Sequence, residues 1–293
     1  MEPYSQSIPD EVLITRSLEG DSKSLEELII RYSGLVYTLI IKMIRNKDDA
    51  ADLSQEVFIK LITKLDSFKH NSSFKTWLYK ITVNHVLNYK KSTTRRRGGF
   101  IQFAKDLDGA PDLEISAGEY YEADQQLLIE ETKQTCMSGM LLCLDPKHRL
   151  VFILGELFGI NDRIGAEVLD ISPENFRVIL SRGKRDLYNF MHNKCGLVNK
   201  ANPCRCEKKT QAFIKMGIVN PGSLRFAGHH LKKIADVSEE KQKVLDNFLD
   251  NEYRELYLQH SFLENPDWVR TLRELLASEK LNHLFNINKK NKP

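Results

Sequence analysis

Two groups of side chains in this sequence have types and spacing that could do chemistry, and the larger one is basic and aromatic. The segment from Lys69 to Arg97 carries eight Lys or Arg residues and no Asp or Glu. Lysine and arginine neutralise phosphates, and aromatic rings offer faces on which unpaired bases stack. The combination indicates contact with a single-stranded or melting nucleic acid, although a basic solvent face over an aromatic core would have the same composition. The aromatic residues in this segment are Phe74, Trp77, Tyr79 and Tyr89.

The second group consists of soft metal ligands. A tetrahedral Zn²⁺ site takes four Cys or His side chains, and four such residues fall within fifteen positions. They are His192, Cys195, Cys204 and Cys206. A structural zinc site, a thiol redox switch and cysteines without a ligand are three readings that the sequence leaves open. We expect no other cofactor to be required.

Several classes of protein are excluded by what the sequence lacks. It contains no carboxylate pair, nucleophile–base pair or glycine-rich phosphate loop, so we expect no enzyme activity. Its 293 residues suggest two or three domains, and 41% hydrophobic and 28% charged residues are typical of a globular protein. No apolar run predicts a membrane span, and the N-terminus lacks the regions of a signal peptide. Because its five cysteines are an odd number, we expect a reducing, cytoplasmic location.

Helical periodicity dominates residues 8–91, which we expect to form the first domain. Apolar residues recur at helical spacing after a capping Asp21 or Ser22. Breaks at residues 45–47 and 71–73 separate three helices. Little of the sequence alternates with period two, so we predict an all-α bundle.

The remaining chain divides into three segments. Residues 92–134 turn acidic after a basic start, with nine Asp or Glu and no Lys or Arg between Asp106 and Glu131, which predicts a flexible linker without its own core. Residues 135–193 contain a short helix, a tight turn and a second helix, which is a helix-turn-helix pattern. Residues 194–293 form an extension that bears the cysteines, with amphipathic helices expected in its second half.

Three strings in these segments resemble the bacterial RNA polymerase sigma factors of the sigma-70 family, in the small extracytoplasmic-function group. The core-binding part of region two is similar to DDAADLSQEVFIKLITKLDSF (48–68), and the minus-ten part is similar to FKTWLYKITVNHVLNYKK (74–91). Region four is similar to DPKHRLVFILGELFGINDRIGAEVLDISPENFRVILSRGKRDL (145–187). The resemblance covers about the first two-thirds of the chain. Three residues of region four depart from the family pattern, namely Gly165, Asp170 and Ile179.

The resemblance implies a non-enzymatic initiation factor that directs core RNA polymerase to promoters and helps to melt the minus-ten element. It implies that region two contacts the clamp of the largest subunit, that region four contacts the flap, and that the acidic linker threads toward the active-site and RNA-exit channels. An anti-sigma factor is a further candidate partner. The alternatives are a free-standing helix-turn-helix regulator of duplex DNA and a metal or redox sensor with a DNA-binding output.

The resemblance also gives roles to single residues. The core-binding residues are Asp48, Asp52, Gln55, Glu56 and Phe58. The minus-ten residues are Lys69, His70, Asn71, Ser73, Lys75, Trp77, Lys80, Asn84, Asn88, Lys90 and Lys91. The minus-thirty-five residues are Asn175, Arg177, Ser181, Arg182, Lys184 and Arg185. An Asn amide can donate and accept on one base edge, which favours Asn84 and Asn88, whereas Trp77 lies on the apolar stripe and suits the core better.

Overall fold

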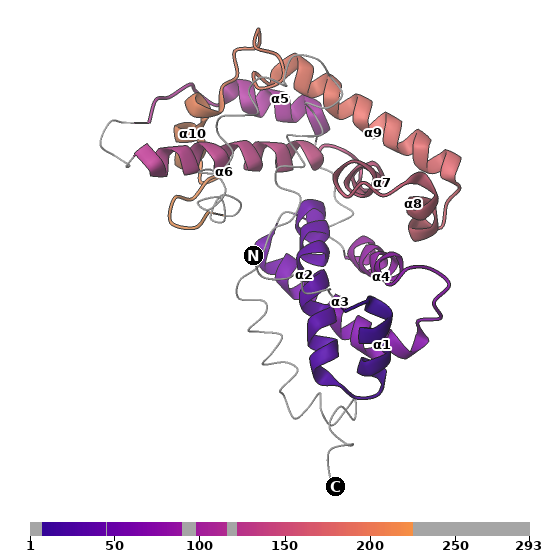
Figure 1. Ribbon diagram of the computed structural model, residues 1–293. Coiled ribbons are helices and arrows are strands. Elements are labelled where there is room, and N and C mark those ends of the chain that lie inside the picture. Colours follow the sequence, from indigo (N-terminus) through magenta and orange to yellow (C-terminus); the bar gives the residue numbers. More distant parts are fainter. Residues whose placement is uncertain (1–7, 45, 90–97, 116–121, 225–293) are drawn as a thin grey trace, which may run out of the picture. The chain divides into compact units, whose positions relative to one another are not determined.

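The computed structural model, drawn in Figure 1, describes residues 8–44, 46–89, 98–115 and 122–224. Within these residues the regular structure is helical, without a strand, and one isolated bridge joins Cys195 to Cys204. The all-α prediction is therefore confirmed. The helices that we expected in the second half of the extension lie outside the described residues.

The N-terminal unit holds described residues 8–41 and 46–88. Asp21 caps α2 by accepting hydrogen bonds from the next turn, and Asn46 caps α3 in the same way. Both helices therefore begin where the sequence predicts, and their apolar residues form a common core. The elements are α1 Asp10–Leu18, α2 Ser22–Ile44, α3 Lys47–Lys64, the 3₁₀ turn η1 Leu65–Ser67 and α4 Phe74–Asn88. Fully buried core residues include Leu28, Val36, Ile40, Val57, Leu61, Leu78 and Val86.

The C-terminal unit holds the described residues from 98 onward, together with residues 42–44 and 89. The side chains of Asp145, Asn161 and Ser172 accept hydrogen bonds from amides of the first helical turn, which fixes the starts of three successive helices. The first and third of these helices have Pro in the first turn. The elements are α5 Gly99–Gly109, α6 Glu122–Leu141, α7 Pro146–Phe152, the π-helical turn η2 Ile153–Leu157, α8 Asp162–Leu169, α9 Pro173–Lys194 and α10 Cys206–Lys215.

The segment expected to be a flexible linker contains helical structure. Helix α5 and most of α6 lie within residues 92–134. Phe100 and Phe103 of α5 stack on Phe190 of α9, with ring centroids 5.0 and 5.7 Å apart. Local composition did not reveal this, because the apolar surface that covers α5 comes from residues far away in the sequence.

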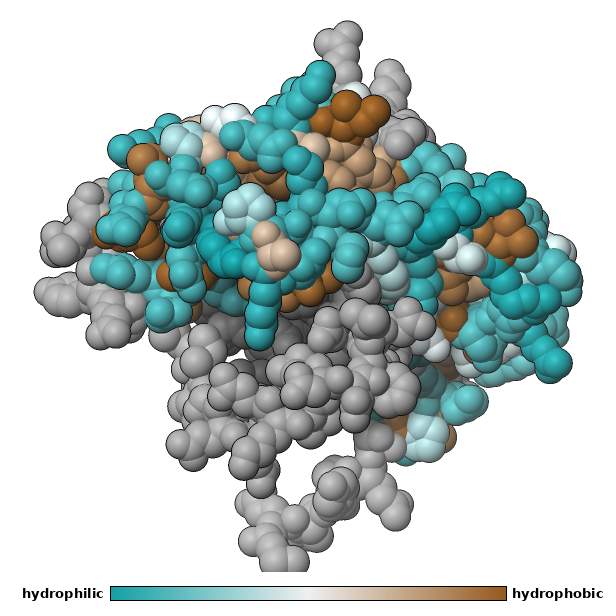
Figure 2. Space-filling model, turned by 90° about the horizontal axis from the view of Figure 1, so that it is seen from above, coloured by the Kyte–Doolittle hydropathy of each residue, from teal (hydrophilic) through white to brown (hydrophobic). Residues whose placement is uncertain are grey.

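The described residues are mostly polar on the face that Figure 2 shows. In the view from above in Figure 2, hydrophilic residues cover most of the coloured surface, and hydrophobic residues occur in separate places. No helix of the described part is long and apolar enough to cross a membrane. The most exposed large apolar side chains include Ile101 (74%), Met216 (55%), Leu197 (47%) and Val178 (45%).

Candidate nucleic-acid interface

Helix α4 begins at a polar turn and rests on an aromatic cluster. The Ser73 hydroxyl accepts a hydrogen bond from the Thr76 amide at 3.1 Å, which caps the helix. Phe68 packs on Phe74 and Trp77, with ring centroids 5.7 and 5.3 Å apart. Trp77 is half-buried in this cluster. The preference for a core role of Trp77 therefore agrees with its position, and the cluster fixes the start of α4.

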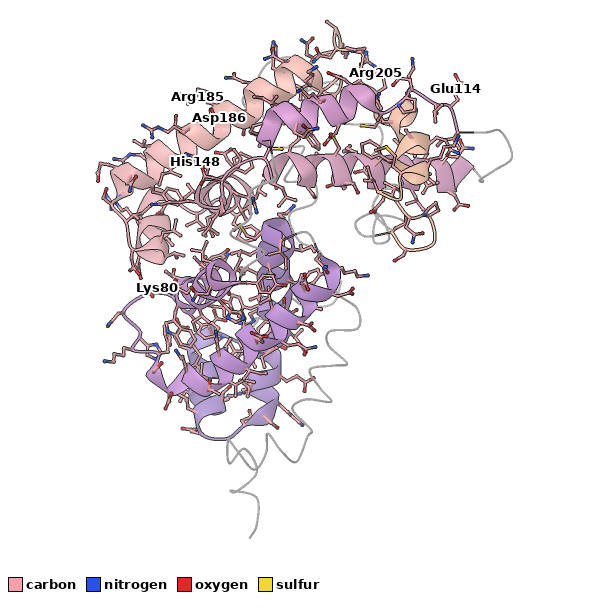
Figure 3. All side chains as sticks on the ribbon, turned by 180° about the vertical axis from the view of Figure 1, so that it is seen from behind. Lys80, Glu114, His148, Arg185, Asp186 and Arg205 are labelled. Carbon is pink, nitrogen blue, oxygen red and sulfur yellow. The ribbon has the colours of Figure 1, made fainter. Side chains whose placement is uncertain are left out.

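The residues expected to contact minus-ten DNA are distributed over the turn and along α4. The Phe68 ring lies 4.5 Å from the His70 ring, and His70 has a φ of 56°, a left-handed backbone conformation that shapes the turn. Lys80, labelled in Figure 3, is half-buried. Lys90 and Lys91 lie outside the described residues. The exposed members of the set are Lys69, His70, Asn71, Ser73, Lys75, Asn84 and Asn88.

Three of the five expected core-binding residues form an exposed acidic row on α3. Asp48, Asp52 and Glu56 lie four residues apart and are exposed, so they share one face of the helix. Gln55 is half-exposed beside this row. Phe58 is only 1% exposed, which contradicts its assignment as a contact residue. Its ring packs inside the unit, because the apolar stripe of α3 runs through position 58.

A charged network that sequence patterns did not reveal joins α3 to α4. His85 Nδ1 lies 2.6 Å from Lys60 Nζ, and His85 Nε2 lies 2.8 Å from a Glu56 carboxylate oxygen. Burial of the ring and the neighbouring Lys60 charge lower the pKa of His85 below its usual value. A neutral His85 therefore accepts from Lys60 and orients Glu56 at the surface. The signal in the sequence was weak, since these residues are 25 to 29 positions apart on two helices.

The helix-turn-helix is formed by α8 and α9, and the unusual residues of this region have structural reasons. A Cβ atom on Gly165 would lie 2.2 Å from the Phe176 ring, so only glycine fits there. Asp170 ends α8 in the left-handed conformation, with a φ of 51°, where the family pattern has glycine. Ile179 is 7% exposed and belongs to the core. The departures therefore adapt the packing between the two helices while keeping the motif.

Helix α9 exposes a polar row in its first half. Asn175, Ser181 and Arg182 are exposed, as the sequence-based assignment requires. Val178, which that assignment missed, is 45% exposed on the same helix. Among the described residues, no ion pair involves Arg182. This row can present an amide, a hydroxyl, a guanidinium and an apolar side chain to a base edge.

The other cations of α9 are paired with carboxylates. Arg177 pairs with Asp162 and with Glu174, and its hydrogen bond lowers the pKa of Asp162. Arg185 lies 3.3 Å from Asp186, and Figure 3 shows the two side by side on α9. A paired but exposed arginine stays available to a phosphate, because such ion pairs are weak in water.

Lys184 is directed toward the protein rather than outward. Its Nζ lies 3.0 Å from Glu156 and 5.7 Å from the centroid of the Tyr188 ring. Glu156 is buried, and the Lys184 side chain is 30% exposed. The pair with Glu156 compensates a buried carboxylate, so Lys184 has a structural role in this arrangement.

The cysteines among the four candidate zinc ligands lie close enough to influence one another, since after burial the charges of Cys195 and Cys204 contribute to the raised pKa of Cys206. Cys195, Cys204 and Cys206 are half-buried free thiols, and His192 is exposed on the last turn of α9. Within the described residues, no group of three or more His, Cys, Asp or Glu side chains is arranged to hold a metal ion. Burial raises the pKa of Cys206 to about 12, which keeps that thiol protonated and weakly reactive. The zinc reading therefore stays a prediction.

Comparison with known proteins finds relatives that share one function. Residues 28–96 match the family model for sigma-70 region 2. The chain is 30% identical over 189 residues to the ECF RNA polymerase sigma-E factor of Escherichia coli (strain K12), a match that covers 63% of this chain and 95% of that protein. The sigma-E factor of Salmonella typhimurium (strain LT2) gives the same identity and coverage.

Two further similarities are weaker. The RNA polymerase sigma-H factor of Pseudomonas aeruginosa is 29% identical over 130 residues, which cover 44% of this chain and 61% of that protein. A solved structure of CnrH in complex with the cytosolic domain of CnrY has a TM-score of 0.43 and 18% identity, and it covers 62% of this chain and 96% of the matched chain.

Proposed function

The chain belongs to the extracytoplasmic-function sigma factors of the sigma-70 family, non-enzymatic proteins that bind core RNA polymerase and direct it to promoters, and we propose which of its surfaces do so. The acidic row of α3 binds the polymerase, α4 with its preceding turn reads the melted minus-ten element, and α9 reads the minus-thirty-five element. Each assignment below rests on exposure, charge and hydrogen-bonding capacity.

The acidic row of α3, residues Asp48, Asp52 and Glu56, docks on a basic surface of the polymerase clamp. Three exposed carboxylates on one face give a field of one sign, which steers association with a basic partner. His85 supports this role, because it lies 2.8 Å from the Glu56 carboxylate and restricts that side chain. Phe58 contributes by fixing α3 in the bundle core rather than by touching the partner.

Helix α4 captures the non-paired strand of the minus-ten element. The observation that carries this proposal is that Asn84 and Asn88 are exposed one turn apart, within a segment that has eight cations and no carboxylate. The amides suit base edges, and the cations suit phosphates. The turn at residues 69–73 is the candidate holder of a base turned out of the stack.

Helix α9 lies in the major groove at the minus-thirty-five element. Its first half carries Asn175, Ser181 and Arg182 as exposed hydrogen-bonding groups for base edges. Val178 adds an apolar surface that suits a thymine methyl group. Arg177 and Arg185 contact phosphates, since both are exposed and their ion pairs are weak enough to exchange.

Three further roles follow from the family resemblance. The acidic linker passes toward the active-site and RNA-exit channels of the polymerase, the helices of region four contact the flap, and an anti-sigma factor is a second partner. Co-purification of the chain with the isolated flap would test the region-four contact, and co-purification with the isolated clamp would test the acidic row of α3.

Run-off transcription with purified core polymerase on a library of genomic fragments tests the whole proposal. We expect transcription to start only when both the chain and core polymerase are present, at fragments that share a minus-ten and a minus-thirty-five element. An Asp52→Lys variant should lose core binding, whereas Asp66→Lys, at an exposed position in the short turn η1, should retain it. Tight, sequence-specific binding of duplex DNA by the chain alone, unchanged by core, would instead favour a free-standing regulator.

A further inference from the structure

The extension beyond α9 folds back onto the segment that joins the two DNA-reading units. Lys194, the last residue of α9, lies 2.7 Å from Asp108 near the end of α5. The Leu113 amide donates a hydrogen bond to the Lys208 carbonyl oxygen at 2.8 Å. Helix α10 packs along α6. The linker and the described part of the extension therefore share one packed structure, although about 90 residues separate the paired positions.

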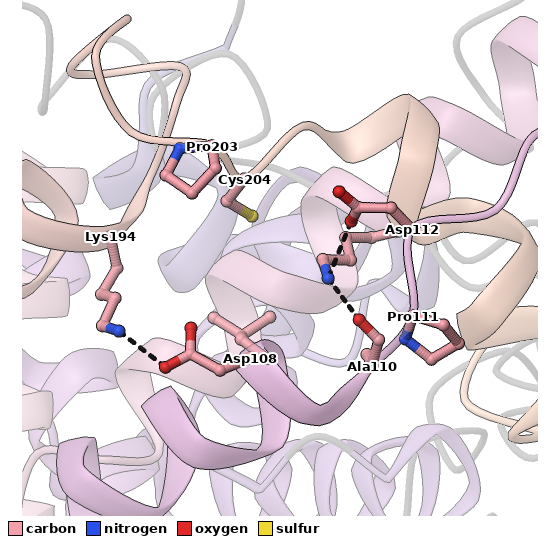
Figure 4. Close-up of a pocket in the computed structure, with 9 residues that line it drawn as sticks. Asp108, Ala110, Pro111, Asp112, Lys194, Pro203 and Cys204 are labelled. Carbon is pink, nitrogen blue, oxygen red and sulfur yellow. Dashed lines mark hydrogen bonds and ion pairs between the residues drawn. The ribbon is translucent and has the colours of Figure 1, made fainter.

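Lys209 is the anchor of this contact. It is 8% exposed, and its ammonium donates to the Ala110 carbonyl oxygen and lies 2.9 Å from an Asp112 carboxylate oxygen. Figure 4 labels both partners and draws the two interactions as dashed lines. A buried ammonium is tolerated only when its hydrogen bonds are satisfied. The two partners lie next to the end of α5, so the linker must stay in place for Lys209 to remain satisfied.

Apolar packing extends the contact on both sides of Lys209. Ala212, Phe213 and Val219 of the extension are buried, and so are Leu128 and Thr132 of α6. Next to this contact is a pocket of about 380 Å³, whose wall comes from both segments. The residues that line it include Leu107, Asp108, Pro111, Pro203 and Cys204.

We propose that residues 194–219 bind the linker within the same chain and hold residues 99–115 in a folded form. This folded form competes with the extended form that the same residues take on the polymerase. This inference rests on the proposed function, in which the linker extends toward the active-site channel. An extended linker cannot keep the Leu113–Lys208 hydrogen bond or the partners of Lys209. The extension therefore lowers the fraction of chain that is ready to form a productive holoenzyme, and it acts as an internal brake.

Hydrogen–deuterium exchange of the full chain, without polymerase, tests the contact itself. Lys209→Met keeps the bulk of the side chain and removes its charge, and Lys208→Met is the matched control, because Lys208 is exposed and contributes its backbone carbonyl. We expect the amides of residues 99–115 to exchange about tenfold faster in K209M than in K208M, since a hydrogen-bonded charge is lost. Equal exchange in the two variants would overturn the contact as an anchor.

Transcription by the reconstituted holoenzyme tests the brake. We expect K209M to give several-fold more transcript than wild type at limiting concentrations of the chain, with K208M unchanged. Asp112→Asn is the milder variant, because the Asp112 side chain that pairs with Lys209 is 47% exposed. This variant decides the case if K209M fails to fold. Faster exchange without a rise in transcript would refute the brake. If wild type and all variants fail to initiate at promoters with core, the proposed function itself is wrong, and the exchange data still decide the contact.

Discussion

Helices α4 and α9 both expose amide side chains to solvent, but the surroundings of their cations differ. In α4 and the residues around it, eight Lys or Arg residues share a segment without one carboxylate. In α9, Arg177, Lys184 and Arg185 are each paired with an Asp or Glu. Arg182 is the cation of the α9 row without an ion pair in the described part of the chain.

The difference fits the two kinds of DNA that we propose for the helices. A melted strand is flexible and keeps its bases exposed, so a segment that is rich in cations can hold it in several positions. A duplex groove requires one register, and carboxylates that fix arginine side chains reduce the entropy lost when those arginines meet phosphates. In α9, we therefore expect the net field to be smaller and the geometry to be stricter.

The largest effect should come from a substitution that disrupts the packing of α8 against α9. Replacing Gly165 by Leu places a side chain against the Phe176 ring, where even a Cβ atom would lie 2.2 Å away. We expect a loss of about 3 kcal/mol in the free energy of unfolding of the C-terminal unit, with core binding by the N-terminal unit retained. Urea denaturation and pull-down measure the two effects. Gly109→Ala is the control, because nothing lies within 4 Å of its Cβ position.

Replacing a single base-reading residue should change the sequence preference at only one of the two promoter elements. We expect Asn84→Ala to lose about 1–3 kcal/mol of discrimination at one minus-ten position, and Arg182→Ala to lose as much at one minus-thirty-five position. Lys90→Ala and Lys91→Ala should weaken all promoters alike and lower the salt slope by about one. Selection from a randomised promoter library with core polymerase provides the readout. An unchanged preference in both Asn84→Ala and Arg182→Ala would remove the contrast between the two helices.

Releasing an arginine of α9 should make that helix resemble α4. Asp162→Asn removes a partner of Arg177, so we expect promoter affinity to rise by about threefold and the salt slope to steepen by about one. Fluorescence anisotropy of holoenzyme on labelled promoter DNA measures both. The double variant Asp162→Asn with Arg177→Gln should lose the gain. A gain that survives in the double variant would show that Arg177 does not contact phosphate.

The N-terminal unit should also respond to acid through His85. Burial and the charge of Lys60 lower the pKa of His85 in the folded state relative to its unfolded value near 6.5. The folded state therefore binds the proton less well, so this contribution to stability is complete above about pH 6.5 and is lost as the pH falls from there toward the folded pKa. Urea unfolding at pH 7.5 and pH 5.5 should show a smaller loss in His85→Gln than in wild type. Equal losses would exclude His85 as the source.

The smallest effect concerns the cysteines of the extension. Because burial raises the pKa of the Cys206 thiol and so disfavours the thiolate that binds metal, we expect purified protein to carry well under one zinc per chain. Chelator should leave the melting temperature unchanged. Elemental analysis that finds one zinc per chain, lost on replacing Cys204 or Cys206 by Ser, would restore the metal reading.

Much of the fold could be predicted from sequence, whereas the residue assignments of the interface stay predictions. Local signals were reliable where the physics is local: Asp21, Asp145 and Ser172 cap helices as their types suggest. Phe58 was assigned wrongly, because a family motif marks a position as important without saying whether its side chain is buried. Lys184 was assigned to the minus-thirty-five contacts, but its partner Glu156 is 28 positions away in the sequence, so a local pattern could not identify the pair.

The sequence by itself determined the helical class, the order of the segments, the family and the basic-aromatic character of the minus-ten region, because helix periodicity, capping and charge depend on neighbouring residues. Only the tertiary structure decided which cations are paired, why position 165 must be glycine, and that the acidic segment is partly helical. It also decided that Lys209 of the extension is buried against the linker. These features depend on contacts between residues far apart in the chain, and burial or pairing arises only when the fold brings them together.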